Sequence, residues 1–259
     1  MLAYLLRLFG RPLARYLTKP LKRYAPVAMV PAQRMTAILL PGDVLLIEGS
    51  SRVSLAIKYL TQSTWSHAAL YLGAEAHATT GHDMPMLIEA DMQEGVRLVP
   101  LTRYEHAHTR ICRPLGLTPD DVQQLIADAL THVGQTYDLG NLLDLARYLL
   151  PTPPVPTHWR RRMIALGSGE PTKAICSSLI ATLFQNIRYP ILPDIEHIPE
   201  EHPGRDTFCA EILHIRSSSL YAPRDFDISP YFQIIKPELP ANFDYRTLHW
   251  DELHELRRK

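Results

Sequence analysis

The stretch that decides the fold runs from residue 65 to residue 73 and reads WSHAALYLG. Its apolar run, Ala68 to Leu72, is short and ends at a glycine, which predicts a strand buried on both faces. His67 stands at the start of this strand, where a rigid sheet would hold an imidazole in the fixed orientation that a catalytic base requires. The chain contains twelve histidines. Most are expected at the surface or in hydrogen bonds, and this context distinguishes His67 from them.

Short apolar runs bounded by turn residues lie on both sides of this strand and predict further strands at 44–47, 86–90, 96–100 and 109–113. Because hairpin-like intervals separate the runs, they favour a mainly antiparallel sheet. Helices are predicted at 54–60, 118–134, 139–150 and 174–186. The one after Thr118 has the clearest start, with that residue as N-cap and Pro119 at the first helical position. The predicted fold class is therefore α+β.

The first 36 residues form a basic arm. Residues 1–42 contain seven arginines and lysines and no acidic residue, and leucines and aromatic residues recur in the arm at helical spacing. The pattern predicts an amphipathic helix, which either contacts a membrane surface through residues 1–25 or docks on its own domain or on a partner subunit. The remaining residues, 37–259, are assigned to one domain with a Pro-rich insertion at 151–172 and a wrapped, extended tail at 189–259.

The composition narrows the class of protein. Lysine plus arginine (27) balance aspartate plus glutamate (27), which gives no reason to expect nucleic acid as the principal partner. Arginines interrupt the first apolar run, so no cleavable signal peptide is expected. The three cysteines, Cys112, Cys176 and Cys209, fit neither a disulfide framework nor a metal knuckle. We expect a cytoplasmic protein that is peripheral to the inner membrane if the arm binds it.

Cys176 lies near the N-terminus of the helix predicted at 174–186. A cysteine acts as a nucleophile in its thiolate form, which a helix N-terminus and a neighbouring imidazole both favour. The backbone amides of the same turn, with Ser177, could form part of an oxyanion hole. The alternative is that Cys176 only fills space in an apolar helix.

Glu89 is the candidate for the group that orients the imidazole. It lies within the apolar strand predicted at 86–90, where a carboxylate is costly unless it is paired. A hydrogen bond from the far nitrogen of His67 would supply that pairing and fix the tautomer of the ring. The alternative is a glutamate that faces solvent.

Five short motifs occur along the chain in a set order. They are Pro41-Gly42-Asp43-Val44, Trp65-Ser66-His67-Ala68, Ile88-Glu89-Ala90, Gly134-Gln135-Thr136-Tyr137-Asp138 and Cys176-Ser177-Ser178-Leu179. In this order the chain resembles the permuted papain-like amidases, and most closely the YiiX/YaeF-like branch of the NlpC superfamily. In that family the histidine strand precedes the nucleophile helix. The resemblance runs from about residue 40 to residue 186 and implies a permuted papain-like fold, with the antiparallel sheet packed against the nucleophile helix.

The resemblance also implies site residues. The catalytic residues would be Cys176 as nucleophile, His67 as base and Glu89 as orienting acid. The substrate-binding residues would be Tyr137, Ser177 and Ser66. No cofactor and no metal are implied. Ser178 departs from the family pattern, because a glutamate is expected there in many relatives.

The function implied is that of a bacterial cysteine hydrolase of the amidase or peptidase type. It would cleave a small amide, peptide or lipid-like substrate through a thioester acyl-enzyme. One alternative is a lipid acyl hydrolase or acyltransferase at a membrane surface, and another is a non-catalytic binding module on the same fold. A metal site built from Cys176, His67 and Glu89 is the least favoured, because no HxxxH or CxxC spacing supports it. The sequence makes no prediction of the oligomeric state.

Overall fold

A computed structural model describes residues 30–73, 84–91, 94–135, 175–200 and 208–236, together with the single residue Lys19. Several predictions lie outside these residues. They concern the amphipathic helix of the arm, the helix at 139–150, the Pro-rich insertion at 151–172 and Tyr137.

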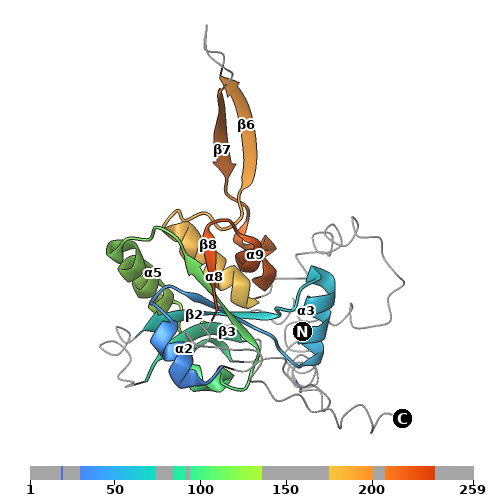
Figure 1. Ribbon diagram of the computed structural model, residues 1–259, viewed down its shortest axis with the longest axis vertical. Coiled ribbons are helices and arrows are strands. Elements are labelled where there is room, and N and C mark those ends of the chain that lie inside the picture. Colours follow the sequence, from blue (N-terminus) through green and yellow to red (C-terminus); the bar gives the residue numbers. More distant parts are fainter. Residues whose placement is uncertain are drawn as a thin grey trace, which may run out of the picture.

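Six antiparallel strands form the central sheet in the order β4-β3-β2-β1-β5-β8 (Figure 1). Their bounds are β1 (Val44–Ile47), β2 (His67–Gly73), β3 (Met86–Asp91), β4 (Gly95–Pro100), β5 (Thr109–Pro114) and β8 (Phe232–Ile235). The predicted α+β class with a mainly antiparallel sheet is confirmed. The five predicted strands are all present, to within one residue at either end.

The sheet has an apolar layer on each face, which explains why β2 is buried along almost its whole length. One layer contains Ala68 and Leu70 of β2 and the inner faces of α5 (Pro119–Thr131), α8 (Ile175–Asn186) and α9 (Pro223–Ile228). The other contains Ala69 and Tyr71 of β2 and is covered by α2 (Ala32–Ile38) and the 3₁₀ helix η1 (Leu101–Tyr104). The two sets alternate along the strand as the pleat requires.

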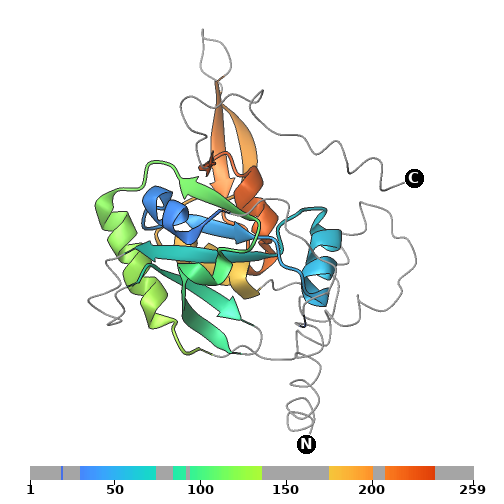
Figure 2. The same ribbon diagram turned by 60° about the horizontal axis from the view of Figure 1, so that its bottom comes forward.

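Helix α3 (Arg52–Thr61) lies beside the end of the sheet at which β1 ends and β2 begins (Figures 1 and 2). Ser51 caps this helix by accepting a hydrogen bond from the backbone of Ser54 at 3.1 Å. The short connection from β1 through α3 to β2 therefore returns the chain to the same end of the sheet, where His67 opens the second strand.

The turn before β1 is fixed by Gly42 and Asp43. Gly42 has φ +91°, a backbone conformation that side chains disfavour. Asp43 is 1% exposed and accepts hydrogen bonds from Arg113 Nε (3.0 Å) and Nη2 (2.8 Å). These two hydrogen bonds, one to each oxygen of the Asp43 carboxylate, join the start of β1 to β5. Met35 of α2 is buried in the layer below, so the domain boundary predicted after residue 36 falls within a helix that packs on the sheet.

Helix α5 begins as predicted, with Thr118 and Asp121 forming a capping box and Pro119 in the first turn. The tail predicted as a wrapped, extended segment contains regular elements in its described part. A hairpin of β6 (Asp194–Glu200) and β7 (Phe208–His214) projects from the body, followed by η2 (Ser218–Leu220), α9 and the edge strand β8 (Figure 1).

Candidate active site

His67 and Cys176 come together at one end of the sheet. His67 is the first residue of β2 and pairs with Ile47, the last residue of β1. Cys176 is the second residue of α8. Its sulfur is close enough to the imidazole to raise the pKa of His67 through its charge and a hydrogen bond. The cysteine is 5% exposed and the histidine side chain 23% exposed, so the pair is sheltered but reachable from solvent.

The thiol and the imidazole approach each other from different layers. His67 lies in register with Ala69 and Tyr71, which face the layer of α2 and η1, whereas α8 packs on the opposite face. Their contact is possible because His67 is the terminal residue of its strand, so its ring lies at the margin of the sheet. Helix α8 begins at the same margin, since Cys176 lies in its first turn, where the backbone N–H groups of a helix have no partner within the helix.

Glu89 of β3 holds the imidazole from the other side. Its carboxylate is 1% exposed, and Oε2 lies 2.8 Å from His67 Nε2. Arg97 Nε donates to the other oxygen, Oε1, at 2.9 Å. The Tyr104 hydroxyl donates to Oε2 as well. A buried carboxylate with this many donors is stable only as the anion.

The charge state of Glu89 fixes the tautomer of His67. Burial alone would raise the pKa of Glu89, but hydrogen bonds from His67 and Tyr104 and the charges of His67 and Arg97 lower it to about 2. An ionised carboxylate only accepts hydrogen bonds, so Nε2 of the imidazole must carry the proton. In the neutral ring, Nδ1 then has the lone pair that can take the thiol proton.

The surroundings of the imidazole favour its charged form. Burial by itself would lower the pKa of His67, but the Tyr104 oxygen, Cys176 and the hydrogen bond to Glu89 together raise it well above its usual range. Burial raises the pKa of Tyr104 to about 12, so at neutral pH the phenol is an uncharged donor, and Cys176 and Glu89 are the neighbours that favour the imidazolium there. The geometry therefore favours an imidazolium between a carboxylate and a sulfur, an arrangement that can stabilise a thiolate.

The stability of the protein should depend on pH through this network. The folded pKa of Glu89, about 2, lies below its ordinary value of 4.5. Its contribution to the free energy of unfolding is therefore complete above about pH 4.5 and disappears as the pH falls through 2. The difference corresponds to about 3 kcal/mol. The raised pKa of His67 makes stability depend on pH in the opposite direction. The contribution of His67 to the free energy of unfolding is complete below about pH 6.5 and is lost as the pH rises toward its folded pKa.

Urea unfolding of the wild type and of Glu89→Gln, followed from about pH 8 to about pH 3, measures this effect. The difference in unfolding free energy between the two should be largest between about pH 4.5 and 6.5 and should shrink on either side. A difference that stays constant over the whole range would contradict the charge assignment.

Three residues were predicted to bind substrate. Ser66 is buried, and its Oγ accepts a hydrogen bond from the backbone N–H of Gly49 at 2.9 Å. Ser177 is fully buried, and its Oγ donates to the carbonyl oxygen of Tyr221 at 2.7 Å. Both hydroxyls thus help to hold the loops around the site together. Tyr137 lies outside the described residues, and the substrate-binding roles of all three remain predictions.

Arg97 and Tyr104 are site residues that the sequence reasoning missed. A signal for Arg97 was present, because a hairpin that pairs the predicted strands 86–90 and 96–100 places this arginine directly opposite Glu89, as the structure shows. No comparable signal exists for Tyr104, which reaches Glu89 from η1.

The described residues contain no group of three or more His, Cys, Asp or Glu side chains placed to hold a metal ion. Around Glu89 the reason is visible, because Arg97, Tyr104 and His67 already surround its oxygens. Ser178 Oγ is buried and has no hydrogen-bond partner in the described part of the chain. Within the same residues, every helix is too short or too polar to cross a membrane.

Comparison with known proteins gives both a family match and matches among solved structures. Residues 39–148 match the model of a family described as permuted papain-like amidase enzyme, YaeF/YiiX, C92 family. The matched segment contains His67 and Glu89 and ends before Cys176. Among solved structures, the chain is similar to the crystal structure of metalloprotein yiiX from Escherichia coli O157:H7, with 16% identity and a TM-score of 0.45. That alignment covers 77% of this chain and 98% of the other. No curated protein matches the sequence.

Proposed function

We propose that the chain, whose residues 39–148 match the family model of the permuted papain-like amidases, is a cysteine hydrolase of this kind and cleaves an amide bond with Cys176 as nucleophile. The observation that supports this most directly is the position of His67, which contacts Cys176 on one side and bonds to Glu89 at 2.8 Å on the other.

The proposed reaction has two halves. The Cys176 thiolate attacks the carbonyl carbon, and the oxyanion that forms lies near the N–H groups of the first turn of α8. The His67 imidazolium gives its Nδ1 proton to the leaving nitrogen, the C–N bond breaks, and an amine and a thioester acyl-enzyme result. Neutral His67 then takes a proton from water, whose oxygen attacks the thioester. The products are a carboxylic acid and the regenerated thiolate and imidazolium.

Glu89 acts in this scheme as a positioning residue. It keeps the proton on Nε2 through both halves and stabilises the imidazolium, while Arg97 and Tyr104 hold the carboxylate in place. Such support is required because a base that rotates or changes tautomer no longer presents Nδ1 to the thiol.

Selective alkylation tests the proposal. The protein is treated near pH 7 with a limiting amount of iodoacetamide, and mass spectrometry identifies the modified cysteine, in the wild type and in His67→Ala. We expect Cys176 to react first in the wild type. In the variant its rate should fall roughly thirty-fold, because an unassisted thiol is only a few per cent thiolate at neutral pH.

Cys112 serves as an internal control within the same molecule. It is fully buried, and burial raises the pKa of its thiol, so it should remain unmodified in both proteins. If Cys176 reacts no faster than Cys112, or if its rate is the same without His67, the enzyme proposal is wrong. A non-catalytic binding module on this fold would then be the better interpretation.

A further inference from the structure

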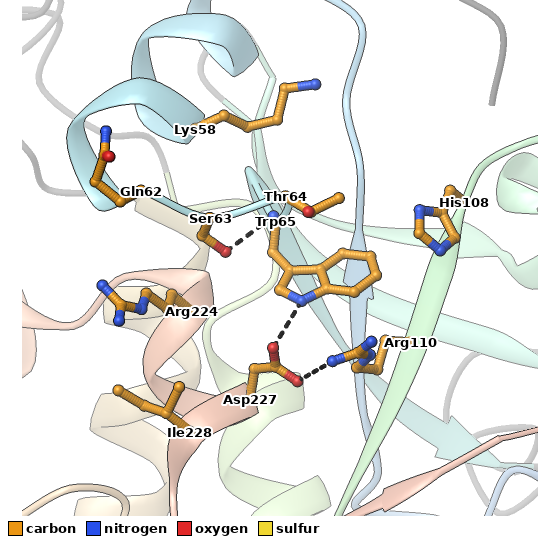
Figure 3. Close-up of a pocket in the computed structure, with 10 residues that line it drawn as sticks. All are labelled: Lys58, Gln62, Ser63, Thr64, Trp65, His108, Arg110, Arg224, Asp227 and Ile228. Atoms are coloured by element: carbon orange, nitrogen blue, oxygen red, sulfur yellow. Dashed lines mark hydrogen bonds and ion pairs between the residues drawn. The ribbon is translucent and has the colours of Figure 1, made fainter. Parts of the chain in front are cut away.

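A cationic pocket lies at the same end of the sheet as His67 and Cys176, between α3, β5 and α9 (Figure 3). Its volume is about 490 Å³. The residues that give it its chemistry are Lys58, Trp65, His108, Arg110, Arg224 and Asp227. None of them belongs to the Cys176–His67–Glu89 network.

The pocket has more positive than negative charge around it. Lys58 pairs with Glu48 at 3.0 Å and Arg110 with Asp227 at 2.7 Å. Arg224, the third cation, lines the pocket and donates to a backbone carbonyl, that of Thr61, at 3.0 Å. Three cations and two carboxylates therefore leave an excess of one positive charge, without counting His108. Such an excess favours a ligand with a single negative charge.

The floor of the pocket is rigid. Trp65 is 2% exposed, and its indole Nε1 donates to Asp227 Oδ2 at 3.0 Å. The guanidinium of Arg110 lies 5.0 Å from the centre of the indole ring and is held by the other oxygen of the same aspartate. Because these groups hold one another in place, a ligand would lose little free energy in ordering them.

The sheet register gives the spacing between the strand that carries His67 and the strand that carries Arg110. His67 and Thr109 both lie opposite Ile47, one on each side of β1. Two interstrand spacings separate them, which is about 10 Å. Arg110 follows Thr109 directly, and Trp65 precedes His67 by two residues. A single extended molecule can therefore reach both places.

We propose that this pocket, whose strand β5 lies about 10 Å from His67, binds a carboxylate of the substrate that Cys176 attacks. This rests on the function proposed above and adds a substrate class to it: small amides with a free carboxylate two or three residues from the scissile bond. A carboxylate matches both the fork of an arginine and the single excess charge, whereas a phosphate monoester carries more charge than the pocket balances.

A pair of alkylating reagents tests the proposal without knowledge of the natural substrate. N-iodoacetyl-triglycine carries a carboxylate about 10 Å from its reactive carbon, and its C-terminal amide is the neutral match. The second-order rate of Cys176 alkylation is measured by mass spectrometry for both. We expect the acid to react about tenfold faster than the amide in the wild type, as one charge-assisted hydrogen bond would give.

Variants then locate the effect. Arg224→Gln should bring the ratio of the two rates close to one, and Arg224→Lys should keep most of the preference. Arg34→Gln, which changes an exposed arginine on α2 at the other face of the sheet, is the matched control and should keep the full ratio. Thermal unfolding of each variant verifies that its fold is intact.

Two results would overturn the inference: a ratio near one in the wild type, or a preference that Arg224→Gln leaves unchanged. Both are distinct from failure of the proposed function, in which Cys176 would not be selectively alkylated by either reagent. Iodoacetate and iodoacetamide, whose charge difference lies next to the sulfur and cannot reach the pocket, should give a ratio that Arg224→Gln does not alter.

Discussion

Replacing Cys176 by serine should abolish formation of an acyl-enzyme, with a fall in rate of about 10⁵-fold. The reason lies in the charge state of the pair. Against the effect of burial, the charge of Cys176 and its hydrogen bond help to raise the pKa of His67, so the imidazolium forms together with the thiolate. A serine hydroxyl does not ionise near neutral pH and cannot supply that charge. The site therefore activates a thiol and not an alcohol.

The measurement uses 4-nitrophenyl acetate as a generic activated acyl donor. The wild type should release nitrophenolate in a rapid burst and carry an acetyl group on Cys176, detected by mass spectrometry. Cys176→Ser should show neither. Cys112→Ala is the control, because it removes the other described free cysteine from the core and should retain the burst. A burst that survives in Cys176→Ser would assign the nucleophile elsewhere.

Replacing Glu89 by glutamine should slow acyl-enzyme formation about a hundredfold, within the range typical of a lost acid–base group. Arg97 donates to Oε1 of Glu89, so the glutamine oxygen should take that place and its amide nitrogen should face His67. An amide nitrogen donates a hydrogen bond, which requires Nε2 of the ring to accept it. The proton would then sit on Nδ1 and point at the sulfur, which is the wrong tautomer for a base.

The pH profile separates this mechanism from simple loss of structure. Without the carboxylate, burial should lower the pKa of His67, so the alkaline limb of the rate profile should move to lower pH. Glu48→Gln is the matched control: Glu48 is also largely buried and pairs with Lys58 and His108, away from Cys176. It should cost stability and leave the profile in place. Equal shifts in both variants would assign the effect to the fold and not to the tautomer.

The sequence by itself determined five strands of the central sheet and the places of His67, Glu89 and Cys176 on their strands and helix. The apolar run that begins after His67, the charge of Glu89 within an apolar strand and Cys176 at a helix start are local patterns, and the structure places all three as those patterns predicted. Such signals can be recognised because the buried face of a strand or helix places apolar residues at a regular spacing along the sequence. Short hairpin intervals likewise predicted an antiparallel sheet, since they leave no room for crossover helices.

Only the tertiary structure decided how these elements meet. Tyr104 reaches Glu89 because η1 packs beneath the sheet, and Cys176 reaches His67 because α8 packs on the opposite face and begins at the same margin. The cationic pocket joins residues from α3, β5 and α9, which are far apart in the chain. These contacts depend on which surfaces gain most free energy by packing together, a non-local property that residue spacing along one segment does not encode.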